Sequence, residues 1–161
     1  MKYRYWILGN VILVSVFTLF LWNYKMTGFL EDLGEGVGRL ATLLFLSNIS
    51  MFFVFMIIKK AAKREIKIFF AKFSRKFFKT HIPFAATGTG IILIHAISMV
   101  IKKGLYNLDL KMIFGYIGLF FLIITLTSGY VRYRRATGFR RKFHLYTGAL
   151  FVLTFIIHIF I

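Results

Sequence analysis

The chain has 161 residues, 59% of them apolar, and a mean hydropathy of +0.77. Soluble domains are roughly 45–50% apolar, so this composition predicts an integral membrane protein with no room for a second, soluble domain. Cysteine is absent, which excludes disulfides, iron–sulfur clusters and covalently attached c-type haem. The formal charge of +17 would indicate nucleic-acid binding in a soluble protein, but the distribution of these charges favours a different explanation.

Five apolar segments each approach the ~20 residues that cross a hydrocarbon layer about 30 Å thick. They are residues 5–24, 37–58, 82–101, 112–131 and 143–161. We therefore expect an all-α, five-helix transmembrane bundle that forms a single domain over residues 1–161. The first segment is too long for a signal peptide and lacks a small-residue cleavage site. Trp6 and Trp22 at its two ends are typical of an aromatic belt.

The basic residues are concentrated on one side of this topology. Seventeen of the 22 Lys and Arg lie in residues 2–4, 59–79 and 132–142. The positive-inside rule then places the N-terminus in the cytoplasm and the C-terminus outside the cell membrane. The Gly-rich, acidic loop over residues 25–36 is expected outside. We expect the basic face to contact anionic lipid head groups and expect no nucleic-acid partner.

Residues 59–79 alternate lysine and arginine with phenylalanine near helical spacing. This pattern predicts an amphipathic helix that lies in the inner membrane interface; a basic loop is the alternative. Pro83 follows closely and is tolerated in the first turn of a helix. It is therefore expected to mark the point where the chain turns into the third span.

The four histidines form two pairs with the same spacing. His81 and His95 lie in the third span, His144 and His158 lie in the fifth, and the two members of each pair are fourteen residues apart. Fourteen residues advance about 21 Å along a helix and return to nearly the same face. Because both spans run outward, His81 should lie level with His144, and His95 level with His158. Ionisable side chains inside a membrane indicate function.

Two opposed imidazoles at each level are typical axial ligands of haem. Zinc usually takes four protein ligands, or three and a water, and no Cys, Asp or Glu inside a span could complete such a site. We expect two haems b, the inner one held by His81 and His144 and the outer one by His95 and His158. Hydrogen bonding between helices is the alternative role for these histidines.

Gly115 and Gly129 in the fourth span are also fourteen residues apart. They would let a macrocycle approach the backbone at the two levels. Gly88 and Gly90 lie between these levels on the third span. The alternative role for these glycines is helix packing. Haem propionates need cationic partners. The inner candidates are Arg132, Arg134, Arg135, Arg140, Arg141 and Lys142, and the outer candidates are Arg39, Lys102 and Lys103.

The paired His-x13-His spans and the run Arg140-Arg141-Lys142-Phe143-His144-Leu145-Tyr146 resemble the transmembrane domain of the ferric reductase/NADPH oxidase superfamily. This resemblance covers about the second half of the chain. It implies two b-type haems that relay electrons across the membrane, with the four histidines as ligands. The same histidine spacing also occurs in the dihaem cytochrome b of quinol-oxidising complexes.

Oxidases of that superfamily continue into a sixth helix and an FAD/NADPH domain, whereas this chain ends at Ile161. Its Gly-rich stretch, residues 34–38, does not follow a strand, so no nicotinamide or flavin site is expected. The leading hypothesis is an electron-transfer subunit that takes electrons from a separate reductase subunit or a quinol and passes them to an external acceptor. The alternatives are a histidine-based proton or ion transporter and a structural membrane anchor.

Overall fold

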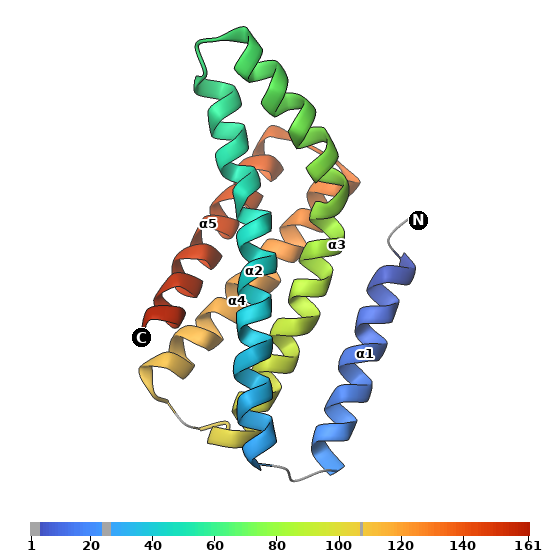
Figure 1. Ribbon diagram of the computed structural model, residues 1–161, viewed down its shortest axis with the longest axis vertical. Helices are drawn as coiled ribbons and strands as arrows, with labels where there is room; N and C mark the ends of the chain where they lie inside the picture. Colours follow the sequence, from blue (N-terminus) through green and yellow to red (C-terminus); the bar gives the residue numbers. More distant parts are fainter. Residues whose placement is uncertain (1–3, 24–26, 107) are drawn as a thin grey trace. The chain divides into compact units, whose positions relative to one another are not determined.

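The computed structural model describes residues 4–23, 27–106 and 108–161, and the side chains of residues 4, 21–23, 27–33 and 35 lie outside that description. The described ranges form helices α1 (Arg4–Asn23), α2 (Thr27–Lys60), α3 (Arg64–Lys103), α4 (Leu110–Arg134) and α5 (Gly138–Phe160) (Figure 1). They divide into two compact units, Met1–Leu105 with α1 to α3 and Tyr106–Ile161 with α4 and α5. The predicted all-α class is confirmed, and each unit is described by itself.

Four helices are long and apolar enough to cross a membrane: α2 over Gly36–Lys60, α3, α4 and α5. The described apolar stretch of α1, Tyr5–Phe20, is shorter than this length. The predicted transmembrane character is supported for the last four spans, and Trp22 lies outside the described side chains.

The predicted loop over residues 25–36 was wrong in its extent, because α2 begins at Thr27. Gly34 explains part of this extension. A Cβ at Gly34 would stand 2.6 Å from Cε of Met99 and 3.3 Å from Cβ of Ser98, so the segment already packs tightly on α3. The acidic side chains of this segment, at positions 31, 32 and 35, lie outside the described residues.

The separate interfacial helix over residues 59–79 was also predicted wrongly. Residues 64–79 are helical, but they belong to the 40-residue helix α3, which continues through Pro83. Proline removes one main-chain donor from a helix, and packing against α2 offsets that loss here. The rings of Phe55 on α2 and Phe78 on α3 lie 5.3 Å apart, and the Thr80 hydroxyl donates to the Phe77 carbonyl at 2.8 Å.

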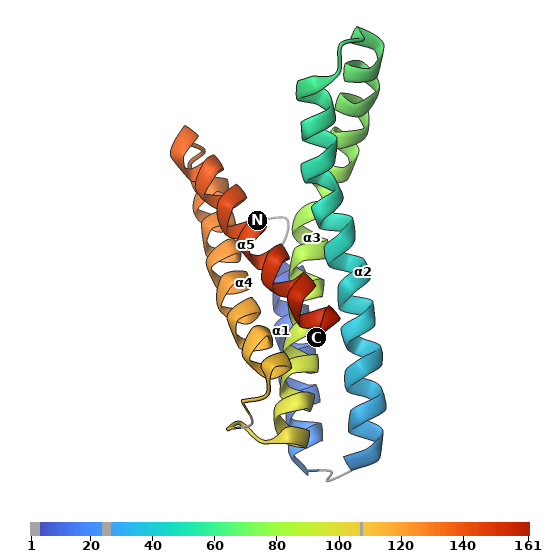
Figure 2. The ribbon, with the colours of Figure 1, turned by 90° about the vertical axis from the view of Figure 1, so that its left-hand side faces the viewer.

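α2 and α3 form an antiparallel pair that is followed over its whole length in Figure 2. Its register is fixed where Phe55 meets Phe78 and where Phe45 lies against Gly88. A Cβ at Gly88 would stand 3.1 Å from Cε2 of Phe45, whose side chain is buried. Small residues at such positions let membrane helices approach closely, so Gly88 serves helix packing.

α1 packs on α3 in the same unit. The indole N–H of Trp6 donates to the hydroxyl of Thr87 at 3.0 Å, and a Cβ at Gly90 would stand 3.2 Å from Oδ1 of Asn10. Gly90 therefore also serves helix packing. Trp6, predicted as a belt residue, joins two helices through a hydrogen bond.

The second unit is the antiparallel hairpin of α4 and α5. Asp109 caps α4 by accepting the N–H of Met112 at 2.7 Å, and Thr137 caps α5 by accepting the N–H of Arg140 at 3.2 Å. Such caps satisfy N–H groups that the first turn leaves open. The buried interface combines large apolar with small polar residues: Met112, Leu122 and Phe151, with Ser128, Thr147 and Thr154.

Replacing Gly88 with valine should lower the thermal unfolding midpoint of the detergent-solubilised protein. The added Cβ stands 3.1 Å from the Phe45 ring, and overpacking of this kind costs about 1–3 kcal/mol. Gly9→Val is the matched control, because nothing lies within 4 Å of a Cβ there. An equal midpoint for the two variants would contradict the packing described for α2 and α3.

Candidate functional site

His95 on α3 donates a hydrogen bond to the main chain of α2. Its Nδ1 lies 2.8 Å from the carbonyl oxygen of Gly34. A carbonyl oxygen only accepts, so Nδ1 carries the proton and Nε2 keeps its lone pair. The ring lies against the next turn of α2, where a Cβ at Gly38 would stand 3.0 Å from Nδ1 and 3.1 Å from Cε1.

His158 on α5 makes the same contact with α4. Its Nδ1 lies 2.8 Å from the carbonyl oxygen of Lys111. A Cβ at Gly115 would stand 3.2 Å from Cε1 and 3.3 Å from Nδ1 of the imidazole. The proton therefore again lies on Nδ1.

His144 repeats the arrangement at the other end of the same hairpin. Its Nδ1 lies 3.1 Å from the carbonyl oxygen of Thr125, and a Cβ at Gly129 would stand 3.1 Å from Cε1. A serine hydroxyl joins this contact, because Oγ of Ser128 lies 3.0 Å from the same Nδ1. All three imidazoles are partly buried.

In each case the accepting carbonyl and the contacting glycine are four residues apart on one helix. We call this arrangement the histidine–carbonyl–glycine contact. A helix carbonyl points toward the residue four positions later. A side chain at that position would cover the carbonyl oxygen, whereas a glycine leaves the oxygen accessible. The oxygen has two lone pairs, so it accepts the imidazole N–H as well as the helical N–H.

His81 stands in a different environment. The α2–α3 register pairs Gly38 with His95 and Phe55 with Phe78, and it therefore pairs Phe52 with His81. Phe52 is half exposed and occupies the place that glycine takes beside the other three histidines. The residue opposite His81 in this register is therefore larger than the glycine opposite His95.

Two buried side-chain atoms in the described part of the chain lack a hydrogen-bond partner: Nδ2 of Asn48 and Oγ1 of Thr125. Asn48 precedes Phe52 by four residues, as Thr125 precedes Gly129. Thr125 is the residue whose carbonyl accepts the His144 hydrogen bond. Buried polar atoms are rarely left unsatisfied without a functional or structural cause.

Sequence reasoning identified part of this site. Gly115 and Gly129 were predicted at the two levels, and the structure places each against a histidine ring. Gly34 and Gly38 were missed, because Gly34 was assigned to the outer loop and residues 34–38 were otherwise tested only as a nucleotide-binding motif. The four-residue spacing from Gly34 to Gly38, set opposite His95 in an antiparallel pair, is the signal that could have revealed them.

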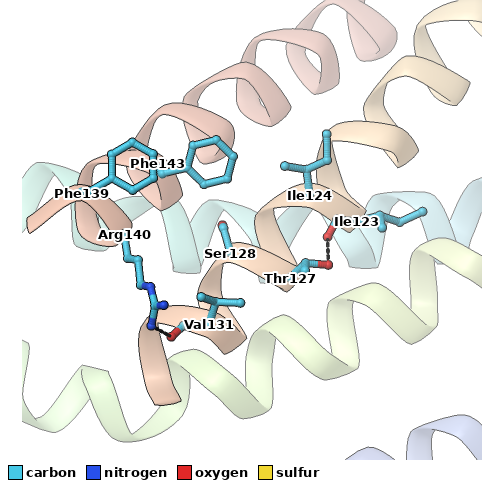
Figure 3. Close-up of a pocket in the computed structure, with 8 residues that line it drawn as sticks. All are labelled: Ile123, Ile124, Thr127, Ser128, Val131, Phe139, Arg140 and Phe143. Carbon is cyan, nitrogen blue, oxygen red and sulfur yellow. Dashed lines mark hydrogen bonds between the residues drawn. The ribbon is translucent and has the colours of Figure 1, made fainter. Parts of the chain in front are cut away.

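A cavity of about 510 Å³ lies between α4 and α5. Figure 3 shows Phe139 and Phe143 of α5 on one wall, with their rings 6.0 Å apart, and Ser128 of α4 opposite. The lining residues are Ile123, Ile124, Thr127, Ser128, Val131, Phe139, Arg140 and Phe143. The walls are therefore mainly apolar, with Arg140 as the charged residue among them.

Arg140 caps the C-terminal end of α4. Its Nη1 donates to the carbonyl of Arg135 at 3.0 Å and to that of Val131 at 3.5 Å. Among the other predicted propionate partners, Arg132 is partly buried. The remaining predicted partners are exposed: Arg134, Arg135, Arg141, Lys142, Arg39, Lys102 and Lys103. Within the described residues, no three His, Cys, Asp or Glu side chains gather to hold a metal ion.

Comparisons of the chain with family models, curated proteins and solved structures find no match. The resemblance to the ferric reductase/NADPH oxidase superfamily stays a prediction from the sequence. The functional argument therefore depends on the geometry of the histidines within each unit.

Replacing Gly38 with valine should break the hydrogen bond from His95 to the Gly34 carbonyl. The added Cβ stands 3.0 Å from Nδ1, so the ring must move away and lose its fixed tautomer. Nitrogen-15 NMR of labelled histidine should show the His95 signals moving toward those of a mixture of tautomers. Gly36→Val is the control, because a Cβ there meets nothing within 4 Å. Unchanged His95 signals in Gly38→Val would refute the contact.

Proposed function

We propose that the chain is a membrane-embedded electron-transfer subunit that holds two haems b. His81 and His144 bind the inner haem, and His95 and His158 bind the outer one. The observation that carries this proposal is the donation of Nδ1–H from His95, His144 and His158 to helix carbonyls. A histidine that binds a metal almost always gives its other ring N–H to such an acceptor.

The residues present fit an axial-ligand role. A neutral imidazole binds iron through a nitrogen lone pair, and the carbonyl bonds leave that lone pair on Nε2 of three histidines. Nε2 lies across the ring from Nδ1 and therefore faces away from the carbonyl.

The pairing of ligands follows from the sequence. Fourteen residues separate the two histidines of α3 and the two of α5, which corresponds to about 21 Å along each helix. The expected topology runs both helices outward. Each level then contains one imidazole from each helix, and the two haems lie at different depths.

The haems, when bound, supply one-electron chemistry. The chain itself would bind the iron through imidazole nitrogens, fixes the rings of His95, His144 and His158 through a carbonyl and a glycine, and would keep water away with apolar helices. A separate reductase subunit or a membrane quinol donates the electrons, and an external acceptor receives them. In this proposal the basic segments lie on the cytoplasmic side, against the lipid head groups of the cell membrane.

The fixed protons disfavour a proton transporter. A relay histidine must release the proton on one nitrogen as it gains one on the other. In His95, His144 and His158 the Nδ1 proton is held by a main-chain acceptor. A role as a structural anchor would not depend on how the histidines are arranged. It is compatible with electron transfer.

Purified protein from haem-replete cells should contain about two haems per chain with low-spin b-type absorbance, if each haem takes two imidazoles. The double variant His95→Ala/His158→Ala should keep one haem, because it removes both ligands of a single site. His95→Ala/His144→Ala should keep none, because it removes one ligand from each site. The haem-to-protein ratio, measured with the unfolding midpoint of each variant, checks the result.

These two double variants remove the same number of histidines, so each controls for the other. If each haem instead took both of its ligands from one helix, the two double variants would have the same haem-to-protein ratio. A colourless wild-type protein would contradict the proposed function as a whole.

A further inference from the structure

The cavity between α4 and α5 has one charged end and an apolar body. All of its lining residues belong to the unit Tyr106–Ile161. Figure 3 shows Arg140 beside Val131 at one end, and Ile123 and Ile124 at the other. The volume of about 510 Å³ lies within the ~300–1,000 Å³ that is typical of ligand sites. A ligand that fits this cavity combines an apolar body with a group that binds arginine.

One edge of the Arg140 guanidinium remains open to an anion. Both of its contacts use Nη1, which donates to the carbonyls of Arg135 and Val131. Within the described residues, its Nε and Nη2 make no hydrogen bond. These two nitrogens form the fork through which arginine binds a phosphate or a carboxylate with two parallel hydrogen bonds. The contacts to α4 hold the guanidinium in place before any ligand binds.

The charges at this end of the hairpin also favour an anion. Six Lys and Arg lie in residues 132–142, whereas residues 110–161 contain no Asp or Glu. The one acid of this unit, Asp109, caps the opposite end of α4. A helix of 25 residues separates it from the basic end by about 37 Å. No acidic side chain of the unit can therefore occupy the fork.

We propose that the cavity binds one anionic phospholipid. The phosphate binds the Nε–Nη2 fork of Arg140, and an acyl chain lies along the stacked rings of Phe139 and Phe143, whose centroids are 6.0 Å apart. Basic pockets between membrane helices on the cytoplasmic side bind such head groups. A single retained lipid differs from general attraction of the basic face to the membrane, because it needs the cavity as well as the charge. The inference goes beyond the proposed function and does not depend on haem.

Native mass spectrometry of the delipidated, full-length protein in detergent measures this binding. Titration with phosphatidylglycerol should show one tight site per chain. Phosphatidylcholine, which has the same phosphate but no net charge, should bind more weakly. Arg140→Lys keeps the charge and loses the fork, so the affinity for phosphatidylglycerol should fall about fivefold. Arg75→Lys is the matched control, because Arg75 is an exposed arginine of α3 outside the cavity, and it should leave the affinity unchanged.

A second variant tests the cavity without changing Arg140. Thr127 lines the cavity and is exposed, and its hydroxyl donates to its own helix at the Ile123 carbonyl, 2.8 Å away. Thr127→Phe should fill part of the space with a ring. Excluding two methylenes of the acyl chain is enough to lower the affinity about tenfold. The thermal unfolding midpoint of each variant checks that it is folded.

Inorganic phosphate separates a lipid site from a site for phosphate alone. It should not displace the lipid, because it lacks the apolar part. Displacement by phosphate, equal affinities for the two lipids, or an unchanged affinity in either folded cavity variant would overturn the inference. Loss of haem with unchanged lipid binding in Arg140→Lys would also overturn it, because the fork would then serve a propionate. A wild-type protein that binds the lipid but no haem would contradict the proposed function and leave the inference standing.

Discussion

The hydrogen bond from an imidazole Nδ1 to a helix carbonyl determines what this protein can do. In hydrocarbon no water competes for either group, so the bond fixes both the tautomer and the plane of the ring. The carbonyl remains bonded within its own helix at the same time. The proposed function therefore requires no break in the helices, because a regular helical hairpin already holds each of these imidazoles in one orientation.

Close approach between helices makes that bond possible. Each ring that makes the contact lies where the neighbouring helix has a glycine, at Gly38, Gly115 or Gly129. Small residues serve the same purpose elsewhere, as Gly88 does beneath the Phe45 ring. Helix packing and imidazole orientation thus depend on the same close approach in these pairs, and a side chain that separated the helices would also displace the imidazoles.

The sequence predicted the helices of the bundle, the four histidines and two of the glycines, because apolar length and a fourteen-residue repeat are local patterns. It could not predict that α3 continues through Pro83, since the packing of Phe55 on Phe78 that sustains the helix joins distant segments. Gly34 was assigned to a loop for the same reason. Its role depends on the register of α2 against α3, which a single sequence does not reveal.

The unequal surroundings of the histidines also arise from tertiary contacts. The α2–α3 register puts Phe52 opposite His81 but Gly38 opposite His95. In the other unit, Ser128 adds a hydroxyl beside His144. A density map of the haem-loaded protein tests the central claim most directly. The account predicts iron bound by Nε2 of His144 and His158, with Nδ1 of each still on the α4 carbonyls. Iron bound through Nδ1, or rings turned away from those carbonyls, would contradict it.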